Sequence, residues 1–386
     1  MTWKIPLADI DFDTQEEEAV LGVLRSKWLT MGAVTQEFEK AFAAYCGVKH
    51  AIACTNATAA LHMACLAAGL GPGDEAIVPS LTFVATANAI RYTGATPVFA
   101  DICNLKDLNI SPDSIESLLT PKTRAVLVVH YAGYACDMVR ISALARRYGL
   151  AVIEDAAHAP GAWLEGCHLG TWGLVGCFSF FSNKNMTTGE GGMMVTNDDS
   201  VAERLRLLRS HGMTTLTWDR HKGHSFSYDV VETGYNYRID EIRAALGLVQ
   251  LGKLESNNAR RRELSALYRK ELHGACPSVQ IPFSSHPGIS SAHIMPVLLP
   301  GNCNRARFME AMKNQGVQTS IHYPPIHRFS AYRRVNDPAA FSLPVTEEAA
   351  AHEVTLPLYA GMRNEDVTFV VQAVRQAVLE VNRIPA

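Results

Sequence analysis

The sequence lacks the patterns that mark membrane-spanning, secreted and zinc-binding proteins. It contains no run of 18 apolar residues, so we predict no helix that crosses a bilayer. Its N-terminal stretch lacks the apolar core of a signal peptide, and we therefore expect a cytoplasmic protein. The nine cysteines are scattered, odd in number and never spaced as CxxC. This distribution favours free thiols in a reducing compartment and argues against a zinc site.

A strong excess of charge of either sign is also absent, and several nucleotide and hydrolase motifs are missing. The net charge is −3 without a basic or acidic block, so we expect no nucleic-acid partner and no contact with a membrane. No GxxxxGK[ST], GxSxG or GxGxxG after a first strand occurs, and GEGG at 189–192 has the wrong spacing. His221 and His224 have no third ligand, so a surface loop is favoured and no metal is expected.

The chain does contain a regular alternation of short apolar runs and helical patterns between residues 50 and 200. Continuously apolar runs fit strands that are covered on both faces. Their alternation with helices predicts an α/β domain with a largely parallel sheet. Ser111 followed by Pro112 marks a helix start. The runs are HAIACT (50–55), EAIVPS (75–80), TPVFADI (96–102), RAVLVVHYAG (124–133), LAVIEDAAHA (150–159), VGCFSF (175–180) and GGMMVTND (191–198).

The C-terminal part follows a different pattern. Residues 237–272 form one long helical pattern, and residues 293–300, 305–316 and 317–325 then follow the order strand, helix, strand. Residues 366–381 have the period of a closing amphipathic helix. We therefore predict two domains, a large one over residues 1–250 and a smaller α+β domain over residues 251–386.

A lysine and an aspartate follow two neighbouring predicted strands. Asp155 ends the strand in VIEDAAHAPGA, and Lys184 follows the next strand in FFSNKN. Because parallel strands gather ligand groups at their carboxyl ends, the two side chains are expected to meet there. A structural ion pair is one interpretation. The other is a pyridoxal phosphate site, which needs a lysine for a Schiff base and a carboxylate beside the pyridine nitrogen.

The remaining parts of such a site are also present. The cofactor's phosphate would require backbone N–H groups at a helix start, and the segment TNATAALHMAC supplies one with Thr58 at the turn. Ser179 and Ser182 offer hydroxyls just before the lysine, and Phe83 offers an apolar face for the ring. On residue type alone, a core position is the alternative for Phe83, because most aromatic side chains lie in the core.

At these residues the sequence resembles the DegT/DnrJ/EryC1/StrS sugar aminotransferases, a family of fold type I pyridoxal phosphate enzymes. The resemblance covers nearly the whole chain and implies a large domain with a mostly parallel seven-stranded sheet between helices, plus a smaller C-terminal domain. The similar segments are WLTMGAVTQEFEKAFAAYCG (28–47), GPGDEAIVPSLTFVATANAI (71–90), TGATPVFADI (93–102), EDAAHAPGA (154–162), SNKNMTTGEGGMMVTND (182–198), GYNYRIDEIRAALGLVQL (234–251) and HYPPIH (322–327).

The resemblance implies a role for each matching position around the cofactor. Lys184 would form the imine with pyridoxal phosphate, Asp155 would pair with the ring nitrogen, and His158 would lie near the phenolic oxygen or ring face. Phe83 would stack on the ring. The phosphate would be held by Ala57, Thr58 and Ser179, and by Asn236 from a neighbouring subunit. On residue types alone, an interior histidine is the favoured interpretation of His158, and a turn cap before the helix is the alternative for Asn236.

Further expectations from the resemblance concern the substrate side. His322, Tyr323 and His327 would face the sugar or nucleotide, and Trp28 and Met31 would lie near the entrance. Two prolines could also make HYPPIH merely a rigid loop. Because the resemblance places Asn236 at the cofactor of the neighbouring subunit, it also implies a homodimer with shared active sites.

Two positions depart from the family pattern. The phosphate turn has Ala57 where glycine is common, and Ala57 can still donate its N–H if the turn needs no positive φ. Asp240 stands where the family often has threonine, which raises a helix-capping question.

The resemblance implies transfer of an amino group from an amino acid, expected to be L-glutamate as in the family, to a nucleotide-linked keto sugar. The combination of His158, the NAT turn, HYAG and HYPPIH is closest to members that aminate C4. Amination at C3 and of a cyclitol such as scyllo-inosose stay open, as does a non-catalytic regulatory protein that binds the cofactor. A dehydratase of the same fold is disfavoured, because those members replace the lysine with histidine.

Overall fold

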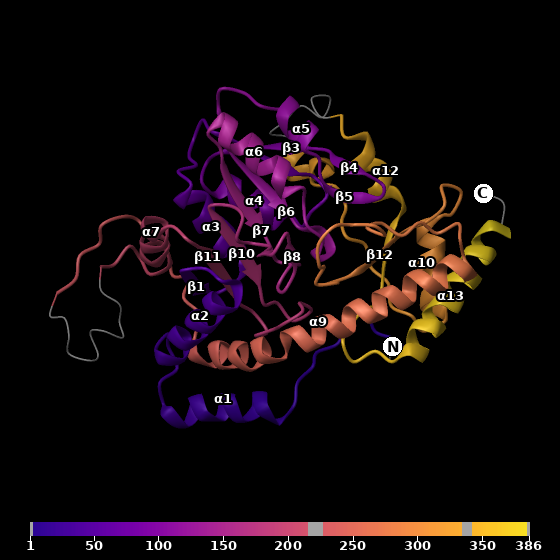
Figure 1. Cartoon of the computed structure of the whole chain (residues 1–386), viewed down its shortest axis with the longest axis horizontal. Helices are drawn as coiled ribbons and strands as arrows, with labels where there is room; N and C mark the ends of the chain where they lie inside the picture. Colours follow the sequence, from indigo (N-terminus) through magenta and orange to yellow (C-terminus); the bar gives the residue numbers. More distant parts are fainter. Residues whose placement is uncertain (1–2, 215–226, 334–341, 384–386) are drawn as a thin grey trace.

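The computed structural model describes residues 3–214, 227–333 and 342–383 (Figure 1). His221 and His224, predicted to lie in a surface loop, fall outside the described residues. Among the helices of the described part, none combines the length and apolar character that a bilayer crossing demands. The same residues hold no group of three or more His, Cys, Asp or Glu side chains arranged for a metal ion.

A seven-stranded sheet forms the centre of the larger part of the molecule. Its spatial order is β1-β11-β10-β7-β6-β2-β3, and β11 alone runs antiparallel to its neighbours. The predicted mostly parallel sheet is therefore confirmed, and each of the seven apolar runs contributes one strand. The strands are β1 (His50–Cys54), β2 (Glu75–Pro79), β3 (Thr96–Ala100), β6 (Thr123–Val129), β7 (Ala151–Asp155), β10 (Val175–Ser179) and β11 (Gly192–Thr196).

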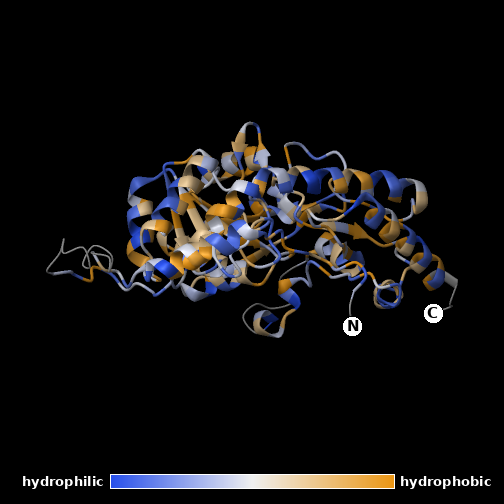
Figure 2. Cartoon of the chain, turned by 90° about the horizontal axis from the view of Figure 1, so that it is seen from below, coloured by the Kyte–Doolittle hydropathy of each residue, from blue (hydrophilic) through white to orange (hydrophobic). Residues whose placement is uncertain are grey.

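Helices cover both faces of this sheet, as the continuously apolar strands require. Successive residues of one strand enter different clusters: Val152 packs with the cluster around Phe38 and Phe42, and Ile153 packs with the cluster around Leu61 and Met63. The larger part's helices are α1 (Thr14–Ser26), α2 (Ala33–Cys46), α3 (Ala57–Ala67), α4 (Ala85–Tyr92), α5 (Pro112–Ser117), α6 (Met138–Tyr148) and α7 (Asp199–Arg209). Figure 2 shows hydrophobic residues on the strands between helices of mixed character.

Local capping explains where several helices begin. Ser111 caps α5 and accepts a hydrogen bond from the Ser114 N–H, with Pro112 in the first turn, as the sequence predicts. Asp240 caps α9 (Glu241–Ala275) through the Arg243 N–H, which answers the capping question at that position. The short remaining elements are the hairpins β4 (Ile102–Asn104) with β5 (Asp107–Ile110) and β8 (Trp163–Leu164) with β9 (Cys167–His168), and the 3-10 turns η1 (Tyr131–Gly133) and η2 (Ile326–Arg328).

The C-terminal part has its own apolar cluster around a two-stranded sheet. Val297, Phe308 and Val371 belong to this cluster, together with residues from the second half of α9. Its elements are β12 (Met295–Leu298), α10 (Arg305–Asn314), α11 (Ser330–Arg333), α12 (Pro344–His352), β13 (Glu353–Leu356) and α13 (Asn364–Arg383). Helix α9 contacts α1, α2 and α13, so it runs along both parts (Figure 1). A domain boundary at residue 250 would lie within α9, and the two-domain division stays a proposal.

The strand predicted at residues 317–325 is wrong. This segment makes only isolated bridges, one of them between Ser320 and Thr355, and β12 instead pairs with β13. Pro324 and Pro325 lack the N–H that a strand ladder requires, so the segment cannot continue as a strand. The segment crosses towards the edge of the large sheet and carries His322 there, as described below.

Candidate functional site

A cavity of about 440 Å³ lies at the carboxyl edge of the large sheet. Because β1, β7 and β10 all run parallel, their carboxyl ends lie at the same edge, and the segments that follow them meet there. The cavity is lined by residues at or after the ends of β1, β2, β7 and β10 and by two residues of the C-terminal part, His322 and Tyr323. The first group includes Asn56, Ala57, Thr58, Thr82, Phe83, Asp155, His158, Ser179, Phe181, Asn183, Lys184 and Glu190.

Lys184 reaches the cavity from a turn just after β10. Its N–H donates to the Phe181 carbonyl at 2.9 Å, which closes the turn. Burial lowers the pKa of the Lys184 amine to about 8, although the Asp155 carboxylate acts in the opposite direction. A substantial fraction of the amine is therefore neutral near physiological pH, as a nucleophile or base requires.

Asp155 ends β7 and is almost fully buried beside the cavity, with 5% of its surface exposed. Its Oδ2 accepts a hydrogen bond from the Thr86 hydroxyl at 2.7 Å, and its Oδ1 accepts one from the Ala157 N–H at 3.2 Å. Burial raises the pKa of Asp155, while these two hydrogen bonds and the Lys184 charge lower it. A cation beside it in the cavity would stabilise the ionised form of this buried carboxylate.

The N-terminus of α3 points its first N–H groups at the cavity. Asn56 caps the helix by accepting from the Ala59 N–H at 2.9 Å, and Ala57 and Thr58 line the cavity in the first turn. Gly192 makes this approach possible, since a Cβ there would lie 2.5 Å from the Asn56 carbonyl carbon and 2.8 Å from the Ala57 nitrogen. Together with the Ser179 hydroxyl, this helix end offers donors for an anion.

Aromatic side chains form the walls of the cavity. Phe83 is 58% exposed despite its size, and its ring centroid lies 6.0 Å from that of Tyr323. The Tyr323 hydroxyl lies 3.0 Å from His158 Nε2, and the Ala132 N–H donates to His158 Nδ1 at 3.3 Å. An exposed phenylalanine beside a polar cavity provides a flat apolar surface for a planar ligand.

His322 approaches from the C-terminal part and is held by β13. Its Nδ1 lies 2.7 Å from the Thr355 hydroxyl, which donates to Glu353 Oε1 at 2.6 Å. Its backbone N–H donates to Glu353 Oε2 at 2.7 Å. Burial raises the pKa of Glu353 to about 8 and lowers the pKa of His322 to about 4. The imidazole is therefore neutral at physiological pH, and it lines the cavity.

The structure brings together most of the residues that the sequence singled out, but not all of them. Within the described residues, those that line the cavity do not include His327, Trp28, Met31 or Asn236. His327 is instead held between the Ser80 hydroxyl at 2.7 Å and Glu347 at 3.0 Å. Met31 is buried, whereas Asn236 is exposed on a segment that precedes α9.

Sequence reasoning missed two residues that contact the predicted pair. Thr86 donates to Asp155, and it lies three residues after Phe83, so its hydroxyl in the first turn of α4 was a usable signal. His293 Nε2 lies 3.4 Å from Lys184 Nζ. The two residues are separated by 109 positions, and no local pattern around His293 indicates this contact.

A seven-stranded, mostly parallel sheet with a lysine and an aspartate at its carboxyl edge defines a fold type I aminotransferase. The chain belongs to the DegT/DnrJ/EryC1/StrS aminotransferase family, whose model matches residues 11–375. It is accordingly a sugar aminotransferase that depends on pyridoxal phosphate.

Known proteins resemble the chain over almost its whole length. The spore coat polysaccharide biosynthesis protein SpsC of Bacillus subtilis is 39% identical, covering 94% of each chain. Helicobacter pylori PseC, an aminotransferase involved in the biosynthesis of pseudoaminic acid, superposes with a TM-score of 0.90 at 31% identity, covering 97% of this chain and 99% of PseC. DesI, solved in the presence of its TDP-sugar product, gives a TM-score of 0.87 at 32% identity, covering 98% of this chain and 93% of DesI.

The residues at the cavity fit pyridoxal phosphate. The aldehyde of the cofactor needs an amine, and Lys184 supplies one with a lowered pKa. The ring nitrogen needs a carboxylate, and Asp155 supplies a buried one. The phosphate needs N–H donors, and the N-terminus of α3 supplies them where Gly192 leaves room for its close approach. Phe83 adds an exposed ring.

Proposed function

We propose that this enzyme transfers the amino group of an amino acid, L-glutamate by family analogy, to a nucleotide-linked keto sugar at C4. The observation that carries the proposal is the meeting of Lys184 and Asp155 at one cavity with the N-terminus of α3. Bound pyridoxal phosphate supplies an electron sink for the carbanion that forms when the donor loses its α-proton.

The two titratable groups of this set have separate tasks. Lys184 would bind the cofactor covalently at rest. Once released, its Nζ would take the proton from the α-carbon of the amino donor and deliver it to the cofactor carbon that carried the aldehyde. Asp155 would face the ring nitrogen and favour its protonated form. Thr86 orients Asp155 through the 2.7 Å hydrogen bond, so the carboxylate cannot rotate away.

The residues that line the cavity support a proposed set of phosphate and ring contacts. The N–H groups of Ala57 and Thr58, with the hydroxyls of Thr58 and Ser179, would hold the phosphate. Phe83 would pack on one face of the ring. His158 lies on the Asp155 side of the cavity, where its Nε2 and the Tyr323 hydroxyl share a hydrogen bond of 3.0 Å.

The sugar is proposed to bind on the side of the cavity that the C-terminal part supplies. His322 and Tyr323 line this side and offer an imidazole and a hydroxyl to sugar oxygens. The cavity volume of about 440 Å³ lies in the range of small-molecule sites. Amination at C4 rests on the similarity of EDAAH and HYPPIH to C4-aminating members, and the TDP-sugar of DesI supports a nucleotide sugar.

We also propose a homodimer with shared active sites. Asn236 is exposed and does not line the cavity of its own chain, although the family resemblance gives it a contact with the cofactor's phosphate. A second copy would bring its Asn236 to this cavity. Trp28 and Met31 are proposed, by the same resemblance, to lie near the entrance of the site. A cytoplasmic location stays a prediction from the sequence.

Replacement of Lys184 by alanine tests the proposed function. The variant Lys184→Ala should lose all turnover and the visible absorbance of covalently bound cofactor, because no other amine lines the cavity among the described residues. Turnover is measured with glutamate and a panel of nucleotide 4-keto and 3-keto sugars and scyllo-inosose. Full activity of the variant would refute the assignment.

The same panel separates the alternative functions. A 3-keto sugar or scyllo-inosose as the best substrate would overturn amination at C4 but keep the aminotransferase. A wild-type protein that binds the cofactor, and whose absorbance does not bleach with any amino donor, would instead favour a non-catalytic regulatory protein.

A further inference from the structure

A buried histidine from the C-terminal part contacts the amine of Lys184. His293 precedes β12 and is 3% exposed, and its Nε2 lies 3.4 Å from Lys184 Nζ. Its backbone is anchored at both ends: the N–H donates to the Ala132 carbonyl at 3.0 Å, and the carbonyl accepts from Arg261 Nη1 at 3.2 Å. The imidazole therefore stands in a fixed place behind the amine.

Two backbone carbonyls set the direction of the hydrogen bonds behind this imidazole. Asn258 Nδ2 donates to the Pro160 carbonyl at 2.8 Å, which leaves its Oδ1 as an acceptor. Asn185 Nδ2 donates to that Oδ1 at 2.7 Å and to the Ser291 carbonyl at 2.8 Å. Since carbonyls only accept, both side-chain amides have one orientation. The Oδ1 of Asn185 is thus turned towards His293.

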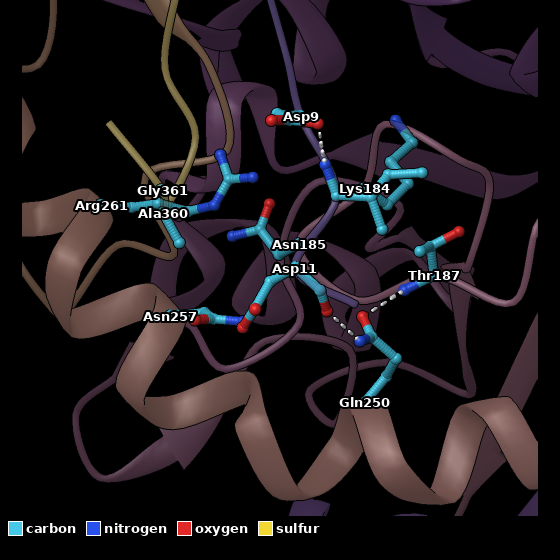
Figure 3. Close-up of a pocket in the computed structure, with 11 residues that line it drawn as sticks. Asp9, Asp11, Lys184, Asn185, Thr187, Gln250, Asn257, Arg261, Ala360 and Gly361 are labelled. Atoms are coloured by element: carbon cyan, nitrogen blue, oxygen red, sulfur yellow. Dashed lines mark hydrogen bonds between the residues drawn. The ribbon is translucent and has the colours of Figure 1, made fainter. Parts of the chain in front are cut away.

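This arrangement determines which nitrogen of His293 carries the proton. Nδ1 lies 2.7 Å from Asn185 Oδ1, an atom that only accepts, so Nδ1 must be the donor. A neutral imidazole has one N–H, and Nε2 is therefore left with its lone pair facing Lys184. Figure 3 shows Asn185 between Arg261 and Asn257 in the small polar pocket of about 110 Å³ that lies against this network.

The surroundings of His293 keep its ring neutral. Burial, and then the positive charge of Lys184, lower the pKa of His293 well below its ordinary value. His158, Arg261 and His322 also face it and act in the same direction. A neutral acceptor holds the amine without the strong preference for ammonium that a carboxylate would impose.

We propose that His293 is a positioning residue for Lys184, whose Nε2 accepts an N–H of the released amine and directs the amine's lone pair into the cavity. A neutral amine has two N–H bonds and one lone pair in a tetrahedral arrangement. With one N–H given to Nε2, the lone pair points away from His293. As the donor's α C–H bond breaks, the N–H bond forms with this lone pair, and its fixed direction raises the rate.

The inference rests on the proposed role of Lys184, and a first test avoids catalysis altogether. The full-length protein is labelled with ¹⁵N-histidine, and His293→Gln identifies the resonances of His293. We expect a proton on Nδ1, none on Nε2, and a pKa below the ordinary value of about 6.5. A proton on Nε2, or titration near about pH 6.5, would overturn the proposal whatever Lys184 does.

A second test measures the reaction with the amino donor in the loaded enzyme. His293→Leu should slow this half-reaction roughly 10- to 100-fold, with bound cofactor retained and the KM for the donor within about twofold. His293→Gln puts Oε1 near the position of Nε2 and an NH₂ group opposite Asn185. His293→Gln should therefore keep about a third of the wild-type rate or more. If His293 had only a structural role, the glutamine and leucine variants would react at the same rate.

A control and a substitute variant complete the design. His168 is also buried, at 2% exposed, and its ring packs against that of Trp163 with centroids 3.6 Å apart. His168→Leu therefore reports the loss of a buried imidazole that does not line the cavity. Its rate should equal that of wild type. If His293→Leu does not fold, His293→Asn replaces it, because the shorter amide reaches Asn185 but not Lys184. Equal rates for the leucine or asparagine variant and the glutamine variant would overturn the proposal.

Discussion

At the scale of single residues, burial acts in opposite directions on the two titratable groups that meet at the cavity. It lowers the pKa of Lys184 and raises that of Asp155, because each charge loses its hydration. Their mutual attraction opposes both shifts. Part of the amine is therefore neutral and can act as a base. The ionised form of the carboxylate is stabilised when a cation lies beside it.

The first prediction concerns pH. Below about pH 8 the Lys184 amine of the cofactor-free protein is mostly protonated, so the rate at which it forms an imine with added pyridoxal phosphate should rise with pH and level off above about 8. Rapid-mixing absorbance measurements across this range check it. A rate that is flat between about pH 6.5 and 9 would contradict the lowered pKa.

The same pKa affects stability in the cofactor-free protein. Between about pH 8 and the ordinary value of 10.5, the unfolded chain holds a proton on Lys184 that the folded chain has lost. The free energy of unfolding should therefore rise with pH in this window relative to Lys184→Met. Denaturant titrations of both proteins measure the difference.

A second prediction concerns Asp155. Asp155→Asn keeps the shape and a partner for Thr86 but removes the charge, so the variant should bind cofactor and lose about 10²- to 10³-fold in kcat. Thr86→Val removes only the hydrogen bond to the carboxylate, so its kcat should fall by a smaller factor. Cofactor absorbance and steady-state rates are the measurements. A wild-type rate for Asp155→Asn would show that no charge is held beside the ring.

At the scale of elements, the close approach of β11 to the start of α3 shapes the phosphate end of the cavity. Gly192 is the first residue of β11 and pairs with Cys54 and with Ser179. It faces the backbone of Asn56 and Ala57 rather than a flexible side chain, so an added methyl group cannot be absorbed by a rotamer change.

The third prediction follows from this contact. Gly192→Ala should push the first turn of α3 away and weaken cofactor binding by more than about tenfold, with the sheet still formed. Absorbance titration with pyridoxal phosphate measures the affinity. Gly252→Ala is a matched control, since nothing lies within 4 Å of its added Cβ in α9. Unchanged affinity in Gly192→Ala would contradict the proposed phosphate site.

At the scale of the whole molecule, the sequence predicts the sheet better than the C-terminal part. The seven apolar runs became the seven strands because parallel strands buried on both faces leave a continuous apolar pattern. The segment at 317–325 lacks such a constraint. Its alternation resembles a strand, but Pro324 and Pro325 remove the N–H groups and β13 takes the place beside β12.

The residues of the site also differ in how far the sequence predicts them. Lys184, Asp155 and Thr58 lie within a few residues of strand ends, so their meeting is a consequence of the topology. Thr86 also lies in the first turn of a helix that follows a strand, whereas the position of the His293 side chain depends on packing between distant segments. The contact of His293 with Lys184 joins residues 109 positions apart, and no local pattern encodes it.

The fourth prediction tests the proposed shared active sites. An Asn236→Leu chain keeps Lys184, and a Lys184→Ala chain keeps Asn236, so a mixed dimer would contain one intact site. Unfolding and refolding an equal mixture of the two inactive variants should restore about a quarter of wild-type activity, because half of the dimers are mixed. Each variant refolded alone is the control. No recovery in a mixture shown to contain mixed dimers would contradict sharing of the site.

The central claim is that Lys184 carries the cofactor, and borohydride reduction followed by peptide mapping tests it most directly. Reduction makes the bond between the lysine and pyridoxal phosphate permanent, so the modified residue is identified by mass spectrometry. We predict a single pyridoxyl group on the peptide that contains Lys184, in about one copy per chain. A label on another lysine, or no label on protein saturated with the cofactor, would contradict the account.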